Sequence, residues 1–113
     1  AIAIAGLPNH TPVMFGGQPV ENDDFGLGRR DDGTIAGAGI VLDEGIRRMI
    51  AAGMDPPLLL ASCTEVAARS LNRSDIGRIA PGSLADLVWW DADWFPRRVW
   101  VGGHEIAVAD QGQ

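Results

Sequence analysis

Residues that form covalent cross-links or bind metals are scarce in this sequence, which has one cysteine and two histidines among 113 residues. Cys63 alone cannot form an internal disulfide, so we expect a protein of a reducing compartment, the cytoplasm. His10 and His104 are far apart, and no His-x-His pattern, cysteine pair or His-Glu-x-x-His motif accompanies them. A metal site held by this chain alone is therefore not expected.

The sequence also lacks basic clusters and long apolar runs. Fifteen acidic residues outnumber nine basic ones, the net charge is −6, and the arginines form no cluster larger than a pair. Nucleic acid is therefore not an expected partner. No apolar run approaches the length of a membrane span, so no membrane partner is expected either. A Gly-x-Ser-x-Gly nucleophile elbow and a dinucleotide-binding glycine loop after a strand are also absent.

The chain opens on a short apolar segment. Residues Ala1–Ala5 alternate alanine and isoleucine, which predicts a strand covered on both faces, as in a parallel sheet. Gly6–Asn9 end this strand with turn-forming residues. Because the first residue is Ala1 rather than methionine and leads directly into a strand, we expect further sequence upstream in the natural protein.

A hairpin and a polar stretch follow. Val13–Phe15 and Gln18–Val20 flank two glycines, a pattern that predicts two short antiparallel strands. Pro19 has no N–H for a second neighbouring strand, so the second arm should lie at a sheet edge. Residues 21–32 are polar, charged and rich in glycine, and we interpret them as a surface excursion.

Two helices are predicted in the middle of the chain. The first has acidic residues at its start and Gly53 at its end, as the helix dipole and a C-terminal cap favour. The second begins with Asp55 as its N-cap and Pro56 in the first helical position. Their apolar stripes are Leu42, Ile46, Met49 and Ile50, and then Leu59, Cys63, Val66, Ala67 and Leu71.

The last third of the chain changes to an extended pattern. Leu87–Trp90 predicts a strand, and Val99–Val101 with Glu105–Val108 predicts a hairpin around Gly102-Gly103. Ala109–Gln113 forms a polar tail. We interpret the four tryptophans of this region as packing within a small β module rather than as a carbohydrate platform. Strand, excursion, two helices and short strands do not form a closed architecture, so the apolar stripes need partners beyond this chain.

Three segments, in this order and spacing, resemble the C-terminal part of the N-acetylglucosamine-6-phosphate deacetylases of the amidohydrolase superfamily. They are Ala1–Gly6, Asp31–Ala38 and Gly77–Val88. The resemblance covers nearly the whole chain and implies an α/β fold: the C-terminal portion of a (β/α)8 TIM barrel, then strands of a small β-sandwich. Residues 1–74 would supply the last strand and helices of the barrel, and residues 75–113 the sandwich strands.

The resemblance also implies a site. In this family a divalent metal activates a water, and an Asp at the end of the last barrel strand carries the proton. The match places that Asp one position before Ala1 and the metal ligands on earlier strands, so neither a catalytic residue nor a metal ligand is expected in this chain. Ala36, Gly37 and Ala38 match the segment that contacts the sugar through its main chain, where small side chains permit close approach. His10 follows the first strand, at the barrel end where catalytic groups gather, and is a candidate substrate contact.

The implied reaction is the hydrolysis of N-acetylglucosamine 6-phosphate to glucosamine 6-phosphate and acetate in amino-sugar catabolism. The implied cofactor is a divalent metal, zinc or a similar ion, and the implied partners are the rest of the same protein and further copies of it in a homo-oligomer. Gly77–Val88 is shared with hydantoinase-like and deaminase members, so an N-acetylgalactosamine-6-phosphate deacetylase or a cyclic-amide hydrolase is an alternative. A non-catalytic, β-rich interaction module is another. Residues 1–113 alone are predicted to be inactive.

Overall fold

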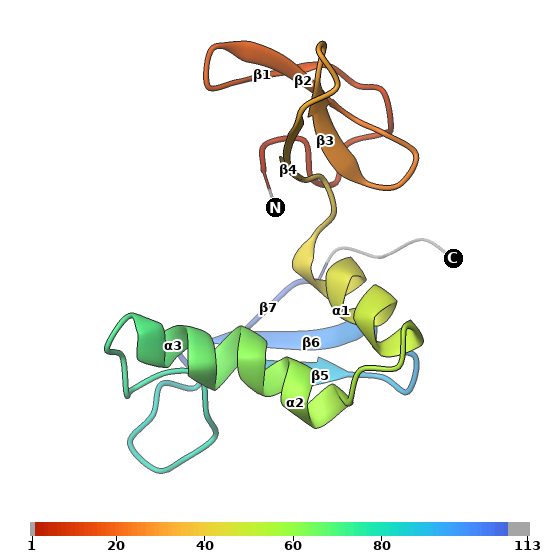
Figure 1. The fold of residues 1–113 in the computed structure, drawn as a ribbon. Helices are drawn as coiled ribbons and strands as arrows, with labels where there is room; N and C mark the ends of the chain where they lie inside the picture. Colours follow the sequence, from red (N-terminus) through yellow and green to blue (C-terminus); the bar gives the residue numbers. More distant parts are fainter. Residues whose placement is uncertain (1, 109–113) are drawn as a thin grey trace. The chain divides into compact units, whose positions relative to one another are not determined.

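The computed structural model describes residues 2–108. These residues contain seven strands and three α-helices, and the chain divides into two compact units, Ala1–Gly45 and Ile46–Gln113 (Figure 1). The division lies inside the first helix. The first unit contains β1 to β4, and the second contains the later helices and β5 to β7.

The first unit is a four-stranded antiparallel sheet in the order β1-β2-β3-β4. Its strands are β1 (Val13–Phe15), β2 (Gln18–Asn22), β3 (Leu27–Arg30) and β4 (Ile35–Ala38). The hairpin predicted from the two glycines is confirmed, because Phe15 pairs with Gln18 across Gly16 and Gly17. Both glycines have a positive φ, 61° and 79°, as a two-residue turn that follows the twist of the sheet requires.

Two expectations about β2 are wrong. The strand lies between β1 and β3, so Pro19 is not in an edge strand. Pairing with β3 begins only at Val20, and the missing N–H of Pro19 therefore costs no hydrogen bond to β3. Residues 21–32 are not a surface excursion, since they contain the end of β2 and all of β3. Two of the buried positions in these strands are Asn22 and Gly28, which are not hydrophobic. Hydropathy alone therefore does not show the alternation of buried and exposed residues that is typical of a strand.

The barrel strand expected at the start of the chain is also wrong, because Ile2–Ala5 form turns. The N–H groups of Ala5 and Leu7 donate to carbonyls three residues earlier, at 2.9 and 3.1 Å. A strand of a parallel sheet needs neighbouring strands as hydrogen-bond partners, and none pairs with this segment within residues 2–108. Ile4 is nevertheless fully buried, as its apolar character predicts. Ala1, the first residue of the predicted strand, lies outside the described residues.

Both predicted helices are confirmed. The helical segments are α1 (Leu42–Ala51), α2 (Pro56–Ala61), the π-helical η1 (Ser62–Val66) and α3 (Ala67–Ser70). Gly53 follows α1 with a φ of 93°, the left-handed conformation that ends many helices. The side chain of Asp55 accepts the N–H of Leu58 at 3.1 Å and thereby caps α2.

The apolar stripe predicted for the second helix is only partly right. Leu59 is buried, but Val66 is 47% exposed and Ala68 is buried in its place. The π-helical turn explains the shift, because its extra residue rotates every later side chain around the helix axis. The hydroxyls of Ser62 and Thr64 donate to carbonyls of the preceding turn at 2.6 and 2.7 Å and compete with the N–H groups of the helix. Apolar periodicity does not report this competition.

The second unit also contains an antiparallel sheet in the order β5-β6-β7. Its strands are β5 (Leu87–Trp90), β6 (Pro96–Val101) and β7 (His104–Ile106). The strand predicted for β5 is confirmed, and so is the last hairpin, because Val101 pairs with His104 across Gly102-Gly103. The second arm is shorter than predicted and begins one residue earlier.

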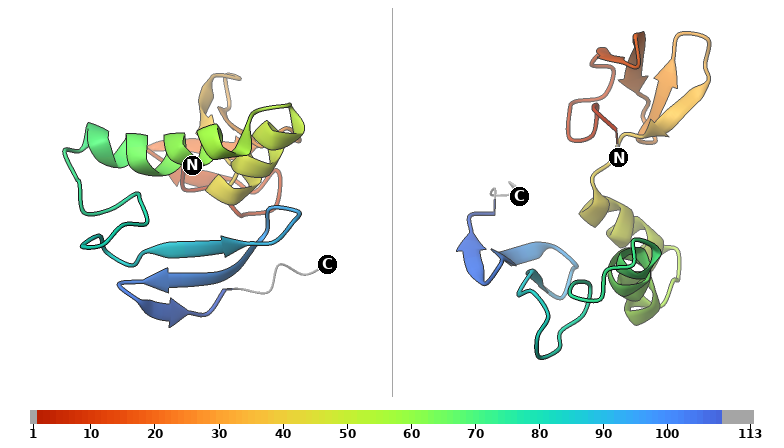
Figure 2. Two further views of the ribbon diagram at one scale, coloured as in Figure 1. Left: turned by 90° about the horizontal axis from the view of Figure 1, so that it is seen from below. Right: turned by 90° about the vertical axis from the view of Figure 1, so that its left-hand side faces the viewer.

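Helices α2 and α3 lie on one side of this sheet (Figure 2). The loop between α3 and β5 is packed closely against the helices at Gly77, which has a φ of 81°. A Cβ atom added there would lie 2.8 Å from the carbonyl oxygen of Thr64, so only glycine fits without a shift of the main chain. This contact anchors the start of the Gly77–Val88 segment on η1.

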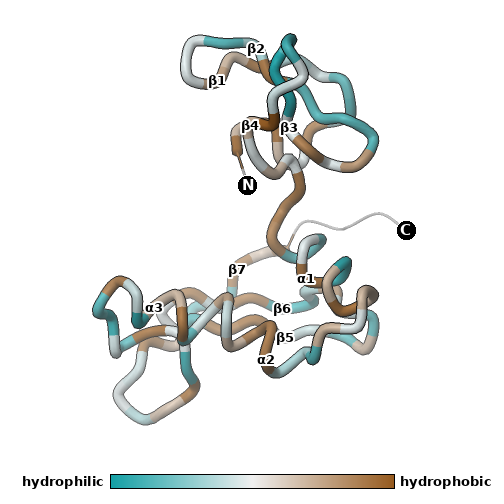
Figure 3. Tube along the Cα trace, viewed as in Figure 1, coloured by the Kyte–Doolittle hydropathy of each residue, from teal (hydrophilic) through white to brown (hydrophobic). Residues whose placement is uncertain are grey.

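Both units leave large apolar side chains exposed. Phe25 is 75% exposed in the first unit and Ile79 is 90% exposed in the second. The segment between β4 and α1 is mostly hydrophobic, because it contains Ile40 and Val41 (Figure 3). The buried apolar side chains within residues 2–108 are Ile4, Val20, Ile46, Leu59 and Ala68. Cores this small leave apolar surface of the kind that packs against another protein segment. None of the helices in these residues is both long and apolar enough to cross a bilayer.

Candidate site at the junction of the N-terminal segment and strand β4

The segment Ala36–Ala38, expected as a substrate-contacting loop, belongs to strand β4. Its pairs with β3 are Leu27 with Ala38, Gly28 with Gly37, and Arg29 with Ile35. Ala36 is therefore an extra residue, a β-bulge, opposite the step from Gly28 to Arg29. The extra residue of a bulge is left out of the hydrogen-bonded ladder, and bulges re-aim the chain next to functional sites.

The N-terminal segment lies directly against this strand. The N–H of Ile2 donates to the carbonyl of Ala38 at 3.0 Å. Gly37 has a φ of 154°, and a Cβ added to it would lie 2.9 Å from Cγ2 of Ile2. A Cβ added to Gly28 would lie 2.7 Å from Cδ1 of Ile4. The close approach that these small residues permit is thus used by the isoleucines of the chain itself.

Asn22 links the same segments and was not identified from the sequence. Its Nδ2 group donates to the carbonyl of Ile4 at 3.1 Å and to the carbonyl of Gly39 at 3.2 Å. Its own main-chain carbonyl accepts the N–H of His10 at 3.0 Å. The side chain is buried, with only 3% of the residue exposed. No sequence pattern distinguishes this asparagine from the charged residues beside it, so only its burial and contacts identify it.

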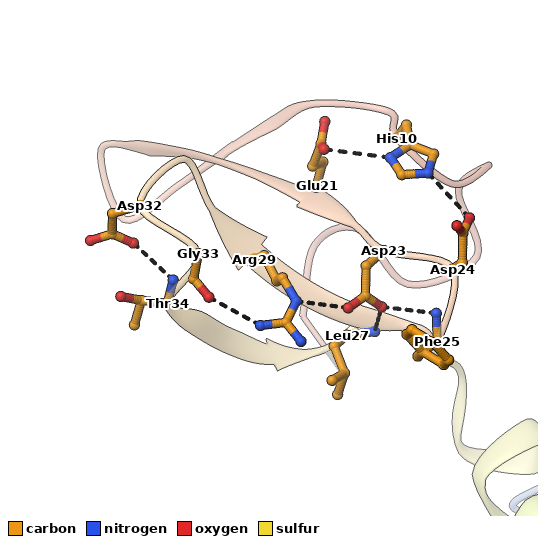
Figure 4. Close-up of polar contacts among 10 residues, drawn as sticks. All are labelled: His10, Glu21, Asp23, Asp24, Phe25, Leu27, Arg29, Asp32, Gly33 and Thr34. Carbon is orange, nitrogen blue, oxygen red and sulfur yellow. Dashed lines mark hydrogen bonds and ion pairs between the residues drawn. The ribbon is translucent and has the colours of Figure 1, made fainter.

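His10 lies on the surface of the first unit between two carboxylates (Figure 4). Nδ1 is 3.5 Å from Oε1 of Glu21, and Nε2 is 3.2 Å from Oδ1 of Asp24. These hydrogen bonds, the one to Asp24 first, raise the pKa of His10 above its ordinary value of 6.5. Within residues 2–108, no hydrogen bond joins the imidazole to Ala36–Ala38. The main-chain N–H of His10 donates to the carbonyl of Asn22, in the neighbouring strand β2.

The turns on either side of β3 are fixed by aspartates (Figure 4). Asp23 accepts the N–H of Leu27 at 2.8 Å and pairs with Nε of Arg29 at 2.7 Å, and both contacts lower the pKa of Asp23. Arg29 also donates to the carbonyl of Gly33 at 3.1 Å. Asp32 accepts the N–H two residues later, which lowers its pKa. These contacts hold β3 and β4 in the register that places Ala36–Ala38 beside Ile2.

A metal ligand set is not found among residues 2–108, which contain no group of three His, Cys, Asp or Glu side chains that could hold an ion. His104 is exposed in β7, in the second unit, and belongs to no such group. The divalent metal implied by the resemblance does not fit any residues of this part of the chain. The junction instead offers main-chain groups of a bulged strand beside a fixed N-terminal segment.

Two tryptophans of the second sheet lie beside Arg98, and one of them, Trp89, is 57% exposed. The guanidinium of Arg98 lies 4.7 Å from the ring centroid of Trp100 and 5.8 Å from that of Trp89. Arg98 also makes two hydrogen bonds to Glu105, at 2.7 and 2.6 Å, which lower the pKa of that carboxyl. These contacts join β5, β6 and β7, and the packing role of the four tryptophans stays a prediction.

Three solved structures of N-acetylglucosamine-6-phosphate deacetylases are similar to the chain. The enzyme from Pasteurella multocida matches 96% of this chain with a TM-score of 0.84 and 25% identity, and the match covers 28% of that protein. The enzyme from Thermotoga maritima matches 93% with a TM-score of 0.81 and 28% identity, covering 29% of that protein. A variant from Mycobacterium smegmatis, in complex with N-acetyl-D-glucosamine-6-phosphate, matches 93% with a TM-score of 0.71 and 25% identity, covering 28% of that protein. The resemblance expected from the sequence is confirmed.

Curated sequences include relatives with other activities. An adenine deaminase from Methanothrix thermoacetophila is 39% identical over 66 residues, which cover 58% of this chain and 12% of that protein. An imidazolonepropionase from Cereibacter sphaeroides is 55% identical over 40 residues, which cover 35% of this chain and 10% of that protein. The chain thus spans 12% or less of these curated relatives and 28–29% of the solved structures. The model of the amidohydrolase family matches residues 22–106, well over half of the chain, so the chain belongs to the amidohydrolase family.

Proposed function

We propose that the chain is the C-terminal part of a metal-dependent hydrolase that converts N-acetylglucosamine 6-phosphate to glucosamine 6-phosphate and acetate. The observation that carries this proposal is the match of 96% of the chain to a deacetylase at a TM-score of 0.84. In this proposal residues 1–74 belong to the end of a (β/α)8 TIM barrel and residues 75–113 to a small β-sandwich, of which residues 109–113 lie outside the described part.

The junction of the N-terminal segment with β4 gives the chain its role in this reaction. Amide hydrolysis needs an activated water, a group that takes its proton and a protonated amine as leaving group. A bound divalent metal lowers the pKa of the water when it is present. In this proposal the carboxylate that carries the proton is the Asp expected directly before Ala1. The hydrogen bond that joins Ile2 to Ala38 supports the proposal, because it holds the segment after that position against the strand proposed to bind the sugar.

The main chain of Ala36–Ala38 is the proposed sugar contact. The carbonyl of Ala38 accepts the N–H of Ile2, and we propose that the peptide groups of the bulged Ala36 contact the substrate. His10 can contact the substrate only if its ring gives up its hydrogen bond to Asp24 or Glu21 and binds the substrate instead. Residues 1–45 carry seven acidic residues and two arginines, so we expect the phosphate group to be bound by basic residues of the rest of the protein.

Hydrolysis of a nucleobase or a cyclic amide is the second candidate. The observation in its favour is the 39% identity to an adenine deaminase, which exceeds the 25–28% identity to the solved deacetylases. That match covers only 58% of the chain, whereas the structural match includes the N-terminal segment and β4 together. The deacetylase proposal therefore has the wider support.

The test is a substrate panel on the complete purified protein loaded with zinc. Acetate release is measured from N-acetylglucosamine 6-phosphate and N-acetylgalactosamine 6-phosphate, ammonia release from adenine, and ring opening from hydantoin. The proposal expects the highest kcat/KM for N-acetylglucosamine 6-phosphate. Ammonia release from adenine with no acetate from either sugar phosphate would establish the second candidate instead.

The same protein allows a test of the non-catalytic alternative. Residues 1–113 expressed alone should release no acetate, bind zinc no better than background and associate through their exposed apolar side chains. We also propose that the complete protein is a cytoplasmic homo-oligomer, which light scattering and cell fractionation measure. A complete protein that is inactive on the whole panel would favour the interaction module.

A further inference from the structure

We infer that Asn22 is a positioning residue of the proposed hydrolase site. Its side-chain amide holds the segment that follows the expected catalytic Asp at a fixed distance from the strand proposed to bind substrate. The inference rests on the proposed function and deepens it, because it assigns a geometric role to a residue that is neither a catalytic group nor a substrate contact.

The amide connects the two sides of the site through one nitrogen. Nδ2 donates one hydrogen to the carbonyl of Ile4 and the other to the carbonyl of Gly39, at 3.1 and 3.2 Å. Ile4 lies in the N-terminal segment, and Gly39 directly follows Ala36–Ala38. The hydrogen bond from Ile2 to Ala38 is the second connection, so two links fix both the distance and the orientation of the segments.

Few other side chains can make this connection. A short side chain with two N–H donors on one atom is needed to reach two carbonyl oxygens from β2, and an aspartate of the same size has only acceptors. Gly39 belongs to the same arrangement, since a Cβ added to it would overlap the amide of Asn22. The pair Asn22 and Gly39 is therefore matched in shape as well as in hydrogen bonding.

The side-chain oxygen of Asn22 argues against a role in fold stability alone. Oδ1 of Asn22 is buried and has no hydrogen-bond partner within the described residues. An unpaired buried oxygen destabilises a fold by about as much as one or two hydrogen bonds stabilise it. The two donated bonds and the unpaired oxygen largely offset each other, so the larger consequence of the amide is the geometry it imposes.

The experiment compares three variants of the complete, zinc-loaded protein. Asn22→Asp keeps the size of the side chain but removes both donors, and Asn22→Ala removes the side chain. Gln18→Glu is the matched control, because it makes the same amide-to-acid change at an exposed position of the same strand. Both kcat and KM are measured per folded, metal-loaded molecule, on the substrate of the panel that the wild type converts fastest.

We expect both Asn22 variants to lose about 10-fold to 100-fold in kcat, because a misplacement of about 1 Å has effects of that size. Gln18→Glu should keep the wild-type value. In Asn22→Asp the ratio of its kcat to that of the wild type should rise toward acid pH, since a protonated carboxyl regains one donor. A role in folding alone would change the amount of folded protein and leave this ratio constant.

Folded Asn22 variants with wild-type kcat and KM would overturn the inference, and so would failure of both variants to fold, which would identify a folding role. Failure of the proposed function looks different. A wild type that converts adenine rather than acetylated sugar phosphates refutes the deacetylase, and the variants are then judged by the same kcat ratio on adenine. A wild type inactive on every substrate refutes both.

Discussion

The turn between β2 and β3 and the turn between β5 and β6 use the same hydrogen bonds, one in each unit. In each, an aspartate accepts the N–H groups two and four residues later, Asp23 at 2.9 and 2.8 Å and Asp91 at 3.0 and 2.8 Å. In each, the same carboxylate pairs at 2.7 Å with Nε of an arginine six residues later, Arg29 or Arg97. The carboxylate thus takes the place of main-chain acceptors in both turns.

The two turns differ at the residue three positions after the aspartate. Gly26 has a φ of 79° and Trp94 a φ of 63°, a left-handed conformation that costs a bulky residue about 1–2 kcal/mol. The carbonyl of Trp94 accepts Nη1 of Arg47 at 3.2 Å, and the same guanidinium lies 4.2 Å from the ring centroid of Phe95. In the first turn the carbonyl of Gly26 accepts the main-chain N–H of Gly39 at 2.9 Å, whereas in the second turn the equivalent carbonyl is held by a cationic side chain of helix α1. A tertiary contact therefore permits a residue that the local geometry disfavours.

Removing the aspartates should have the largest effect. Asp23→Ala and Asp91→Ala each lose two hydrogen bonds to main-chain N–H groups and one ion pair, and we expect the greatest loss of thermal stability in this series. Because Arg47 also supports the second turn, amide exchange should accelerate more at Gly26 in the first variant than at Trp94 in the second. The opposite order would break the comparison.

Gly26→Trp gives the first turn the residue of the second turn without the contact that Arg47 makes there. We expect the complete protein to lose about 1–2 kcal/mol of unfolding free energy, the cost of the left-handed conformation. Urea denaturation measures it. Phe25→Trp, at the exposed neighbouring position, is the control for adding an indole and should be close to neutral. A neutral Gly26→Trp would show that the turn tolerates tryptophan unaided.

Arg47→Met tests the tertiary contact and should cost about 1 kcal/mol, from a charge-assisted hydrogen bond and a cation–π contact. The loss should be smaller when Trp94 is replaced by glycine, which adopts the left-handed conformation without support. A double-mutant cycle should therefore give a coupling energy of at least about 0.5 kcal/mol. Additive effects of Arg47→Met and Trp94→Gly would mean that the contact does not support the strained residue.

Acid should weaken both turns by a smaller amount before the protein unfolds. Hydrogen bonds from Leu27 and Phe95, and then the arginines, lower the pKa values of Asp23 and Asp91 in the folded state. This stability is present above the unfolded pKa of about 3.9 and is lost as the pH falls through the folded pKa. The protection factors of the Gly26 and Trp94 amides should fall below about pH 4 in the wild type and not in the alanine variants. Equal acid sensitivity of the wild type and the alanine variants would show that the two carboxylates do not cause the effect.

His10→Gln should have the smallest effect, because His10 and its partners are exposed. Asp24 and Glu21 raise the pKa of His10, so its contribution is complete below the unfolded pKa of about 6.5 and is lost as the pH rises through the folded pKa. The wild type should exceed His10→Gln in Tm by more at pH 5.5 than at pH 8. A difference that grows with pH would contradict the ion-pair geometry.

The sequence predicts those elements whose signals are local. Gly16-Gly17 and Gly102-Gly103 identified two hairpin turns, and Asp55 with Pro56 identified a helix start, since each depends on backbone preferences within a few residues. The apolar pattern of Ile2–Ala5 predicts burial. It does not predict whether the segment forms a strand, because that also depends on whether neighbouring strands are present. The apolar stripe predicted for the residues after η1 is wrong, because one π-helical turn changes the number of residues per helical turn.

The candidate site shows the same limit. Ala36–Ala38 could be identified from small residues and a family resemblance, but its bulge and its contact with Ile2 follow from pairing between distant segments. Asn22 has no local signal, because an asparagine in a polar run resembles any surface residue. Its importance comes from two carbonyls that lie 18 and 17 residues away in the sequence.

We propose above that the natural protein is an N-acetylamino-sugar phosphate deacetylase whose proton-carrying Asp directly precedes Ala1. The most direct measurement is acetate release from N-acetylglucosamine 6-phosphate by the complete protein and by a variant in which the residue preceding Ala1 is replaced by asparagine. We expect this residue to be Asp and its replacement to lower kcat by about 100-fold or more, with zinc content and folding unchanged. A different residue at that position, or a variant that keeps wild-type kcat, would refute the proposal.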